Sequence, residues 1–261
     1  MLLEAREVSK VYRGRRGGAP VVAVDRASMS VAPGRFVAVV GESGSGKSTL
    51  ARMLLGLIPA SDGHVLLDGE DIATMRGERM AHFRRSVQAV LQDPAGSLNP
   101  RKRVRQAIGE VVRLHRMANG AAGVRAKIVE ALELVGLTPG EQFLERFPGE
   151  LSGGQRQRVL IARAIVVDPE IIVADEAVSA LDASVKAGVL RTMRELTERL
   201  GVGYVFITHD LPVVKKVADE VIVMKSGRIV ESGPKAQIFS EPRQEYTRTL
   251  LAAAPVLEPV A

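Results

Sequence analysis

The stretch GESGSGKS, residues 41–48, decides the fold of this 261-residue chain, because it fits the phosphate-loop pattern G-x-x-x-x-G-K-[ST]. An apolar strand expected over Arg35–Val40 precedes it, and a helix expected over Ser48–Leu57 follows it. Glycine turns before a helix direct several backbone N–H groups at one point, which forms an anion-binding nest. The residues predicted to surround a nucleoside triphosphate are Gly41, Ser43, Gly44, Ser45, Gly46, Lys47, Ser48 and Thr49.

Two side chains of this phosphate loop (Gly41–Ser48) have distinct predicted roles. Lys47 is expected to reach the β- and γ-phosphates and to assist the reaction there, and Ser48 is expected to offer its hydroxyl to Mg²⁺. The plain alternative is a chance glycine-rich loop. The flanking apolar strand and helix argue against it, since the chemistry requires both.

Two acids follow an apolar run at Pro169–Ala174, which predicts a strand that ends in carboxylates. Parallel α/β sheets bind ligands at the carboxyl ends of their strands, so Asp175 is a predicted Mg²⁺ ligand. Glu176 is the predicted group that polarises the attacking water. An ordinary acidic loop is the alternative, and the phosphate loop elsewhere in the chain favours the functional interpretation.

Three further side chains are candidates with open alternatives. His209 follows a strand expected over Gly203–Thr208 and can contact a γ-phosphate or orient water, or it can be structural. Gln92 follows a strand expected over Arg85–Gln92 and offers a carbonyl oxygen to Mg²⁺ and an amide to water, but it can also be an ordinary strand-end amide. Tyr12 can stack on a nucleobase or be a simple strand aromatic.

A second glycine turn stands far from the first, at Leu151–Gln155 (LSGGQ), which we call the signature loop. Ser152 is a good N-cap, and Gly153 and Gly154 expose N–H groups, so this loop predicts another anion site. It carries no lysine. A plain capped helix is the alternative, and one nucleotide site in one chain does not need both loops.

Composition limits the remaining possibilities. The chain has a net charge of +6 and an isoelectric point near 9.8, but its basic residues are scattered and aromatic residues make up only 3%. A basic solvated surface is therefore favoured over a nucleic-acid-binding one. The chain contains no cysteine, which excludes disulfides and thiolate metal sites. No apolar run is long enough to span a bilayer, so we expect a cytoplasmic protein.

Alternating strands and helices predict a parallel α/β core. From about residue 99 to residue 166 the pattern becomes helical, with Val104, Ile108 and Val112 on one face and Ile128 and Leu132 on the next. A further amphipathic helix is expected over Ala183–Leu200, and a short helix in the tail after Pro242.

The ordered set of motifs resembles the nucleotide-binding subunit of ABC transporters over nearly the whole chain. The resemblance implies a P-loop NTPase (RecA-like) fold, with a parallel-sheet core, an antiparallel β sub-domain and an inserted helical sub-domain. It places an ABC ATPase domain at 1–251, with its core at about 1–92 and 167–240 and its helical sub-domain at about 93–166. A short extension covers 241–261.

The resemblance also assigns ATP and Mg²⁺ as cofactors and a head-to-tail dimer as the working unit. It implies that Ser152, Gly153, Gly154 and Gln155 contact the ATP of a partner subunit, and that Asp182 contributes from a D-loop at Ser179–Asp182. The partners implied are a second ATPase subunit, two transmembrane permease subunits and, indirectly, an extracytoplasmic substrate-binding protein. The expected location is peripheral, at the cytoplasmic face of the membrane.

A narrower resemblance joins Leu91–Pro94 and Ser97–Arg101, together with Glu245–Thr247 in the tail, to the peptide/nickel importer group and its second ATPase subunit. Ala177 departs from the proline often found after the glutamate, which alters the loop and leaves the carboxylates in place. The main alternative is a non-transport ABC ATPase acting on nucleic acid or the ribosome. A P-loop kinase or GTPase is disfavoured by the signature loop and by the lack of an Asn-Lys-x-Asp string.

Overall fold

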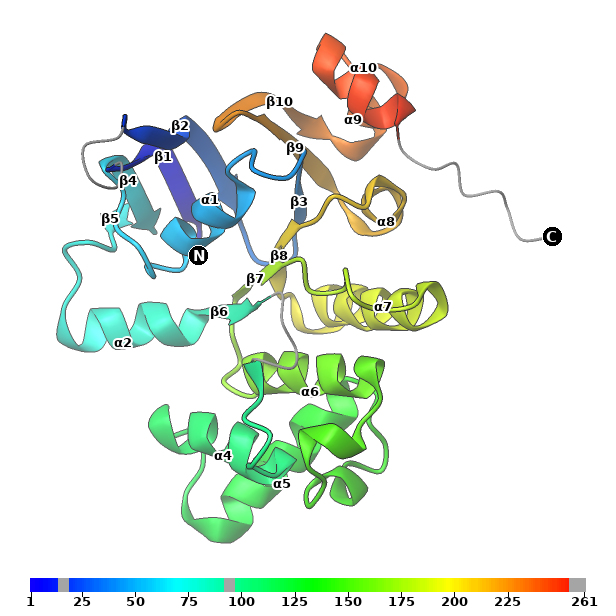
Figure 1. Cartoon of the computed structure of the whole chain (residues 1–261). Helices are drawn as coiled ribbons and strands as arrows, with labels where there is room; N and C mark the ends of the chain where they lie inside the picture. Colours follow the sequence, from blue (N-terminus) through cyan, green and yellow to red (C-terminus); the bar gives the residue numbers. More distant parts are fainter. Residues whose placement is uncertain (14–18, 92–96, 254–261) are drawn as a thin grey trace.

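The computed structural model describes residues 1–13, 19–91 and 97–253, and it forms two sheets with helices around them (Figure 1). Within these residues one sheet is six-stranded, in the order β10-β9-β3-β8-β7-β6. Its strands are β3 (Phe36–Val40), β6 (Val87–Val90), β7 (Ile171–Asp175), β8 (Gly203–Ile207), β9 (Glu220–Lys225) and β10 (Arg228–Pro234). All neighbouring pairs are parallel except β9 and β10. The fold class predicted from the sequence is confirmed.

The three central strands explain why this sheet forms. Every residue of β3, β7 and β8 is buried, as expected for continuous apolar runs covered on both faces. The β-branched and aromatic residues of these runs favour extended backbone and close packing. Because the strands are parallel, their carboxyl ends meet at one edge, and the loops that follow them carry the predicted site residues.

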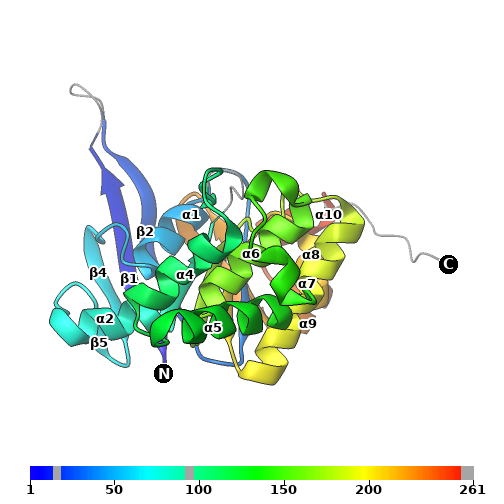
Figure 2. The same ribbon diagram turned by 90° about the horizontal axis from the view of Figure 1, so that it is seen from below.

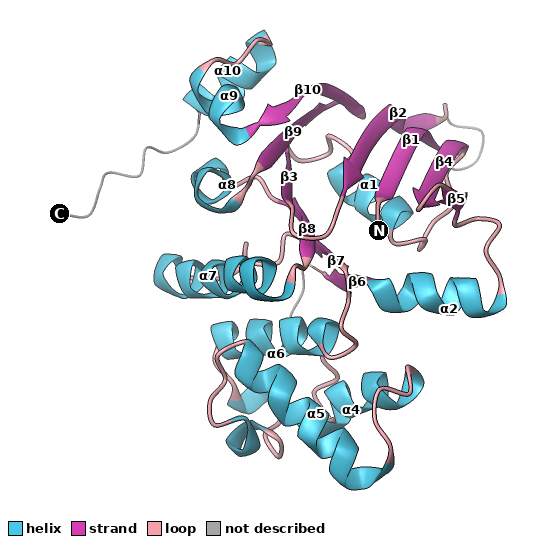
Figure 3. Ribbon diagram, turned by 180° about the vertical axis from the view of Figure 1, so that it is seen from behind, coloured by secondary structure: helices cyan, strands magenta, loops and turns pink. Residues whose placement is uncertain are grey.

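The second sheet is antiparallel and lies over one face of the first (Figure 3). Its order is β2-β1-β4-β5, with β1 at Leu3–Tyr12, β2 at Val21–Val31, β4 at Asp62–Leu67 and β5 at Glu70–Asp71. Helix α1 (Lys47–Leu54) lies between the two sheets, and its buried Leu50, Met53 and Leu54 join apolar residues of both in one core cluster. The phosphate loop is thereby fixed between two layers.

A helical segment is inserted between the neighbouring strands β6 and β7. It contains α4 (Val104–Leu114), α5 (Gly120–Leu134), two short 3₁₀ turns at Gly140–Phe143 and Pro148–Glu150, and α6 (Gly153–Ile165). In the view from below, these helices lie together at the front, nearest the viewer (Figure 2). The predicted apolar faces are buried, including Ile108, Val112 and Leu132, and they belong to the same core cluster as the inner residues of the parallel sheet.

The remaining helices follow β7 and the C-terminal strands. They are α7 (Ala183–Leu200), α8 (Leu211–Val217), α9 (Lys235–Ser240) and α10 (Glu245–Ala252). Helix α7 has the predicted bounds and ends at Gly201, whose positive φ of 71° terminates it as a left-handed cap. Helices α9 and α10 lie beside the end of the β9–β10 hairpin (Figure 1).

Two local predictions differ from the structure. Residues 77–86 form a helix, α2 (Gly77–Ser86), which the sequence did not predict, and the strand expected from Arg85 begins at Val87. Only Phe83 and Ser86 of α2 are buried, so the helix has no apolar stripe that its sequence could reveal. Helix α1 ends at Leu54, three residues early, because Gly56 has a positive φ of 63° that breaks the turn.

Candidate functional site

The phosphate loop connects β3 to α1, and its glycines are required by close backbone contacts. A Cβ atom at Gly41 would collide with the carbonyl oxygen of Met224, and one at Gly46 would collide with the carbonyl oxygen of Ala23. Gly46 also has a φ of 103° at the N-cap of α1, a conformation that side chains disfavour. The loop therefore curls tightly against β2 and β9, and its N–H groups open at the helix N-terminus.

Lys47 is only 5% exposed and lies inside this curl. Its Nζ donates hydrogen bonds to the carbonyl oxygens of Gly41 and Glu42, at 2.8 and 2.7 Å. Burial lowers the pKa of Lys47, and the nearby carboxylates of Glu176 and Asp175 offset part of that decrease. A phosphate group brought to this ammonium would add further negative charge and favour the protonated lysine.

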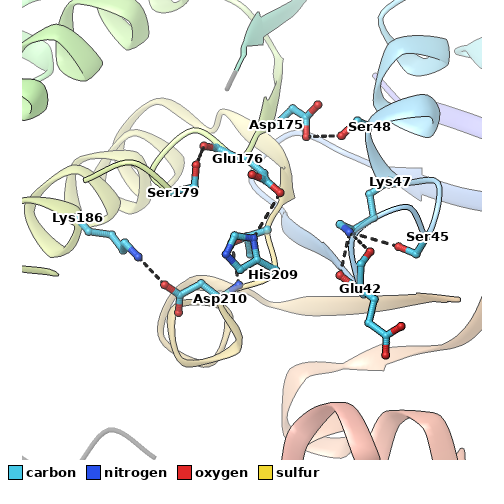
Figure 4. A network of polar contacts seen from close by, with 12 residues as sticks. Glu42, Ser45, Lys47, Ser48, Asp175, Glu176, Ser179, Lys186, His209 and Asp210 are labelled. Atoms are coloured by element: carbon cyan, nitrogen blue, oxygen red, sulfur yellow. Dashed lines mark hydrogen bonds and ion pairs between the residues drawn. The ribbon is translucent and has the colours of Figure 1, made fainter. Parts of the chain in front are cut away.

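The two acids predicted after β7 face the phosphate loop (Figure 4). The Ser48 hydroxyl donates to Oδ1 of Asp175 at 3.1 Å, so the two predicted Mg²⁺ ligands are already adjacent. Burial raises the pKa of the Asp175 carboxyl, the Ser48 hydrogen bond opposes the rise, and the Glu176 charge adds to it. Two carboxylates and one hydroxyl beside a phosphate site are a donor set that fits a hard divalent cation.

Glu176 is held in an uncommon backbone conformation, with a φ of 47°. Its N–H donates to the carbonyl oxygen of Ile207 at 2.9 Å, which ties it to the neighbouring strand β8. Its own carbonyl oxygen accepts from the Ser179 hydroxyl at 3.0 Å. His209, at the end of β8, places Nδ1 3.4 Å from Oε1 of Glu176 (Figure 4). These contacts fix the carboxylate at the edge of the sheet.

These groups line a cleft of about 730 Å³. Its walls consist of the phosphate loop, the start of β2 and the ends of β7 and β8; the lining residues are Val21, Val22, Ala23, Ser43, Gly44, Gly46, Lys47, Ser48, Thr49, Glu176 and His209. The structure thus brings together eight predicted residues from three distant parts of the sequence: Ser43, Gly44, Gly46, Lys47, Ser48, Thr49, Glu176 and His209. Val21 and Val22 line the cleft without having been predicted, because exposed valines in a strand carry no chemical signal.

Gly41, Ser45 and Asp175 do not line the cleft themselves but form hydrogen bonds with Lys47 and Ser48, which do. Two further predicted residues, Tyr12 and Asp182, also do not line it. Tyr12 is 40% exposed at the end of β1, opposite Val21 in the antiparallel register, and Lys10 lies over its ring at 5.5 Å. Asp182 is the exposed N-cap of α7. A third, Gln92, lies outside the described residues.

The signature loop contributes no residue to this cleft. Ser152 caps α6, with its hydroxyl accepting from the N–H of Gln155 at 3.2 Å, and the Gln155 side chain accepts from the N–H of Ser152 at 3.0 Å. Gly154 packs so closely on Val185 of α7 that a Cβ atom there would collide with it. Ser152 is exposed. The signature loop is therefore a capped helix N-terminus that does not line the cleft of its own chain.

An ion pair that the sequence did not predict connects the helix under the signature loop to the residue that follows His209 of the cleft. Lys186 of α7 binds Oδ2 of Asp210 at 2.6 Å, and Asp210 caps α8 directly after His209 (Figure 4). Lys186 stands next to Val185, on which Gly154 of the signature loop packs. Charged residues on a helix are common, so their spacing alone could not identify this pair.

The fold and the cleft define the class of the protein: a P-loop protein with a nucleotide site at the carboxyl edge of a parallel sheet. A family model described as ABC transporter matches residues 24–179, which is more than half of the chain. The chain therefore belongs to the ABC transporter family, as one of its ATP-binding ATPase cassettes.

The curated relatives include a glutathione import ATP-binding protein, GsiA. The protein from Escherichia coli O157:H7 is 44% identical over 239 residues, and that from Salmonella typhi is 43% identical over the same length. Each match covers 92% of this chain and 38% of the relative, so the chain spans well under half the length of these proteins.

Solved structures of ABC cassettes have the same fold. One is the ATP-binding cassette MJ0796, in a dimeric post-hydrolysis state bound to ADP and Pi. It has a TM-score of 0.78 and 28% identity, and the match covers 89% of this chain and 98% of that one. Another is cbiO1 from Clostridium perfringens, described as part of the ABC transporter complex cbiONQ. It has a TM-score of 0.78 and 28% identity over 92% of this chain and 90% of the other.

Proposed function

We propose that this chain binds ATP with Mg²⁺ in the cleft and hydrolyses it to power an importer of peptide-type cargo. The observation that carries the proposal is the convergence of Lys47, Glu176 and His209 on one cleft at the carboxyl edge of the sheet. A buried ammonium for phosphate, a positioned carboxylate for water and a glycine nest are the parts that phosphoryl transfer to water needs.

In this proposal each residue has one task. The phosphate loop binds the triphosphate, and Lys47, held by the carbonyl oxygen of Gly41, directs its ammonium group to the phosphate oxygens. Ser48 and Asp175 hold Mg²⁺, which when bound supplies charge that offsets the phosphates. Glu176 orients and deprotonates the attacking water, and His209, which contacts Glu176, fixes the position of that carboxylate. Gln92 is assigned to the same Mg²⁺ and water on the basis of the resemblance.

The signature loop supports a head-to-tail pair of cassettes. Its N–H donors and Ser152 do not line the cleft of their own chain, and the loop Leu151–Gln155 carries no lysine. We propose that Ser152, Gly153, Gly154 and Gln155 contact the γ-phosphate held by a partner cassette, with Asp182 beside them. The dimeric MJ0796 cassette supports such a pairing. Because this chain carries both loops, two copies of it would complete both sites.

The transport role rests on the relatives. Both GsiA proteins are named for glutathione import, which supports peptide-type cargo and gives no support to nickel or to action on nucleic acid. Within the described residues no helix has the length and apolar character of a membrane span. From the resemblance to importer ATPases we propose a peripheral position at the cytoplasmic membrane face. The helical segment between β6 and β7 docks on a complex of two permease subunits that receives cargo from a binding protein.

The direct test measures ATP binding and phosphate release by the purified full chain, beside Lys47→Ala. The wild-type chain is expected to bind Mg-ATP and release phosphate, and Lys47→Ala to bind ATP at least about tenfold more weakly, because it loses a charge-assisted contact. A matched control is Lys127→Ala, a lysine of α5 whose partners are Asp168 and Glu130. Equal ATP affinity in wild type and Lys47→Ala would overturn the phosphate assignment.

A further inference from the structure

The C-terminal helix α10 reaches the phosphate loop, although 204 residues separate them in sequence. The backbone N–H of Glu42 donates a hydrogen bond to the hydroxyl of Tyr246 at 3.2 Å. Glu42 is the second residue of the phosphate loop, and Tyr246 is the second residue of α10. The family match at 24–179 does not include this helix.

Tyr246 and Lys47 hold the same peptide group from its two sides. The N–H that binds Tyr246 and the carbonyl oxygen of Gly41 belong to one planar peptide unit, and they point in opposite directions in a trans peptide. The Gly41 carbonyl accepts from Lys47 Nζ at 2.8 Å. A donor on one side and an acceptor on the other polarise the unit and strengthen both hydrogen bonds. The hydroxyl of Tyr246 therefore fixes the plane of the peptide that Lys47 contacts.

A buried carboxylate fixes the start of α10 and with it Tyr246. Glu231 of β10 is 8% exposed and accepts from the N–H groups of Arg243 and Gln244, at 2.8 and 3.1 Å. These donors lie just before the first turn of α10, where no intrahelical acceptor is available and negative charge is favoured. Burial opposes ionisation of Glu231, yet its polar contacts with Thr247, Arg243 and Gln244 outweigh this and lower its pKa.

The hairpin that holds α10 also supports the phosphate loop directly. Lys225, at the end of β9, lies 4.6 Å from the centre of the Tyr246 ring, a cation–π contact that fixes the ring. Two residues later, the N–H of Gly227 donates to the carbonyl oxygen of Ser45 in the loop, at 2.9 Å. The β9–β10 hairpin, α10 and the phosphate loop therefore form one connected unit.

A simple packing role for Tyr246 is the alternative, since its ring and the neighbouring Leu250 and Leu251 pack against the main core. Packing requires the ring and does not require the hydroxyl. The contact with Glu42 uses the hydroxyl alone, so removal of that hydroxyl distinguishes the packing role from the positioning role.

From this arrangement we propose that Tyr246 is a positioning residue for nucleotide binding. It holds the Gly41–Glu42 peptide in the plane that orders the phosphate loop and orients Lys47. The inference rests on the proposed ATP site and extends it: the C-terminal helix becomes part of the nucleotide-binding structure.

The test compares Tyr246→Phe with wild type in the purified full chain, using Mg-ATP and Mg-ADP binding and steady-state phosphate release. Loss of one neutral hydrogen bond is expected to raise the Kd of both nucleotides and the KM for ATP by about threefold to tenfold. The kcat is expected to stay within about twofold, because Tyr246 touches no reacting atom. Thr249→Ala is the matched control, since Thr249 is exposed on the same helix and its hydroxyl bonds only to Glu245.

A second variant tests the positioning role of Tyr246 independently of its own side chain. Glu231→Gln loosens the start of α10 without touching the phosphate loop, so it is expected to raise the Kd in the same direction by a smaller factor, about twofold to threefold. If Tyr246→Phe and Glu231→Gln bind ATP as tightly as wild type, Tyr246 has only a packing role. If wild type itself binds no ATP, the proposed function fails instead, so the two failures are distinguishable.

Discussion

The phosphate loop and the signature loop are both glycine turns at a helix N-terminus, yet they differ in everything around the turn. The phosphate loop surrounds a lysine that is 5% exposed and lies beside two carboxylates. The signature loop has no lysine, and its Ser152 and Gln155 satisfy each other in a capping box. The first loop lines a cleft of about 730 Å³, to which the second contributes nothing.

This difference suits two distinct tasks. The phosphate loop is the one proposed to bind nucleotide, and the signature loop is the one proposed to complete a nucleotide site in a partner. Burial lowers the pKa of Lys47 even with Glu176 and Asp175 nearby, so an anionic ligand in the phosphate loop would favour the charged lysine further. The signature loop is stable as it stands, and its remaining donors are available to a ligand held elsewhere. In the proposed function, a second cassette brings its signature loop to the nucleotide that this chain's phosphate loop holds.

The largest effect on phosphate release is expected at Glu176, the proposed general base, which lines the cleft with the phosphate loop. Glu176→Gln removes the only negative charge that contacts His209 among the described residues and leaves the lining of the cleft almost unchanged in shape. Phosphate release is expected to fall by about 10²–10⁴, the usual contribution of a general base, while ATP affinity changes little. Single-turnover hydrolysis and equilibrium ATP binding measure the two quantities separately. A variant that retains near wild-type turnover would contradict the assignment.

A charge placed in the signature loop gives the next largest effect. A Cβ atom at Gly153 would lie 3.3 Å from Leu181 Cδ2, so an aspartate fits with a small shift, and its charge suits the N-terminus of α6. In the proposed dimer the same charge faces a partner's phosphate. Gly153→Asp is expected to lower turnover on the order of tenfold to a hundredfold through like-charge repulsion.

The matched control for this variant is Gly153→Asn, which has the same shape without the charge. It is expected to retain more turnover than Gly153→Asp, and both are expected to bind ATP as wild type does. Equal losses in the two variants would indicate a steric effect and not a phosphate contact. Weakened ATP binding in Gly153→Asp would place the loop at its own chain's nucleotide.

The ion pair between the two regions gives a smaller effect. Lys186 and Asp210 connect α7, on which the signature loop packs, to the residue after His209, and both side chains are largely buried. Lys186→Met is expected to reduce kcat about threefold to tenfold, because the position of His209 relaxes. In a double-mutant cycle with Asp210→Asn the two changes should couple by about 0.5–3 kcal/mol. Additive effects on kcat would show that the pair does not act as a unit.

The smallest effect is on stability. Because the pKa of Asp175 is raised above its ordinary value of 3.8, the folded chain binds more protons than the unfolded chain just above that pH. The stability of the nucleotide-free chain therefore falls as pH rises through this window. Asp175→Asn is expected to remove this loss and raise the Tm at neutral pH by about 2–4 °C. Thermal unfolding across this pH range checks it, and an unchanged or lower Tm would contradict it.

Much of the fold could be predicted because its strongest signals are local. The apolar runs of β3, β7 and β8 and the amphipathic face of α7 appear directly in the sequence, and their bounds differ by a residue or two. Helix α2 could not be predicted, since only Phe83 and Ser86 of its residues are buried. Its stability comes from tertiary contacts that no periodic pattern records.

The candidate site shows the same difference between local sequence signals, which can be predicted, and long-range contacts, which cannot. Lys47, Ser48, Asp175 and Glu176 are predictable because phosphate chemistry dictates both residue type and spacing. The contacts that hold them are not predictable, because they join distant segments. The hydroxyl of Tyr246 reaches Glu42 across 204 residues, and Lys186 meets Asp210 only after two helices have packed. Sequence patterns reveal reacting groups more readily than the groups that position them.

The central claim, that the two loops act on nucleotide from opposite subunits, is tested most directly by mixing two inactive variants. Lys47→Ala disables the phosphate loop and Gly153→Asp disables the signature loop, so a mixed dimer contains one site with both loops intact. An equal mixture is expected to recover phosphate release to about a quarter of wild type, since half the dimers are mixed and each has one of two sites. A mixture no more active than the separate variants, at concentrations where wild type is active, would contradict the account.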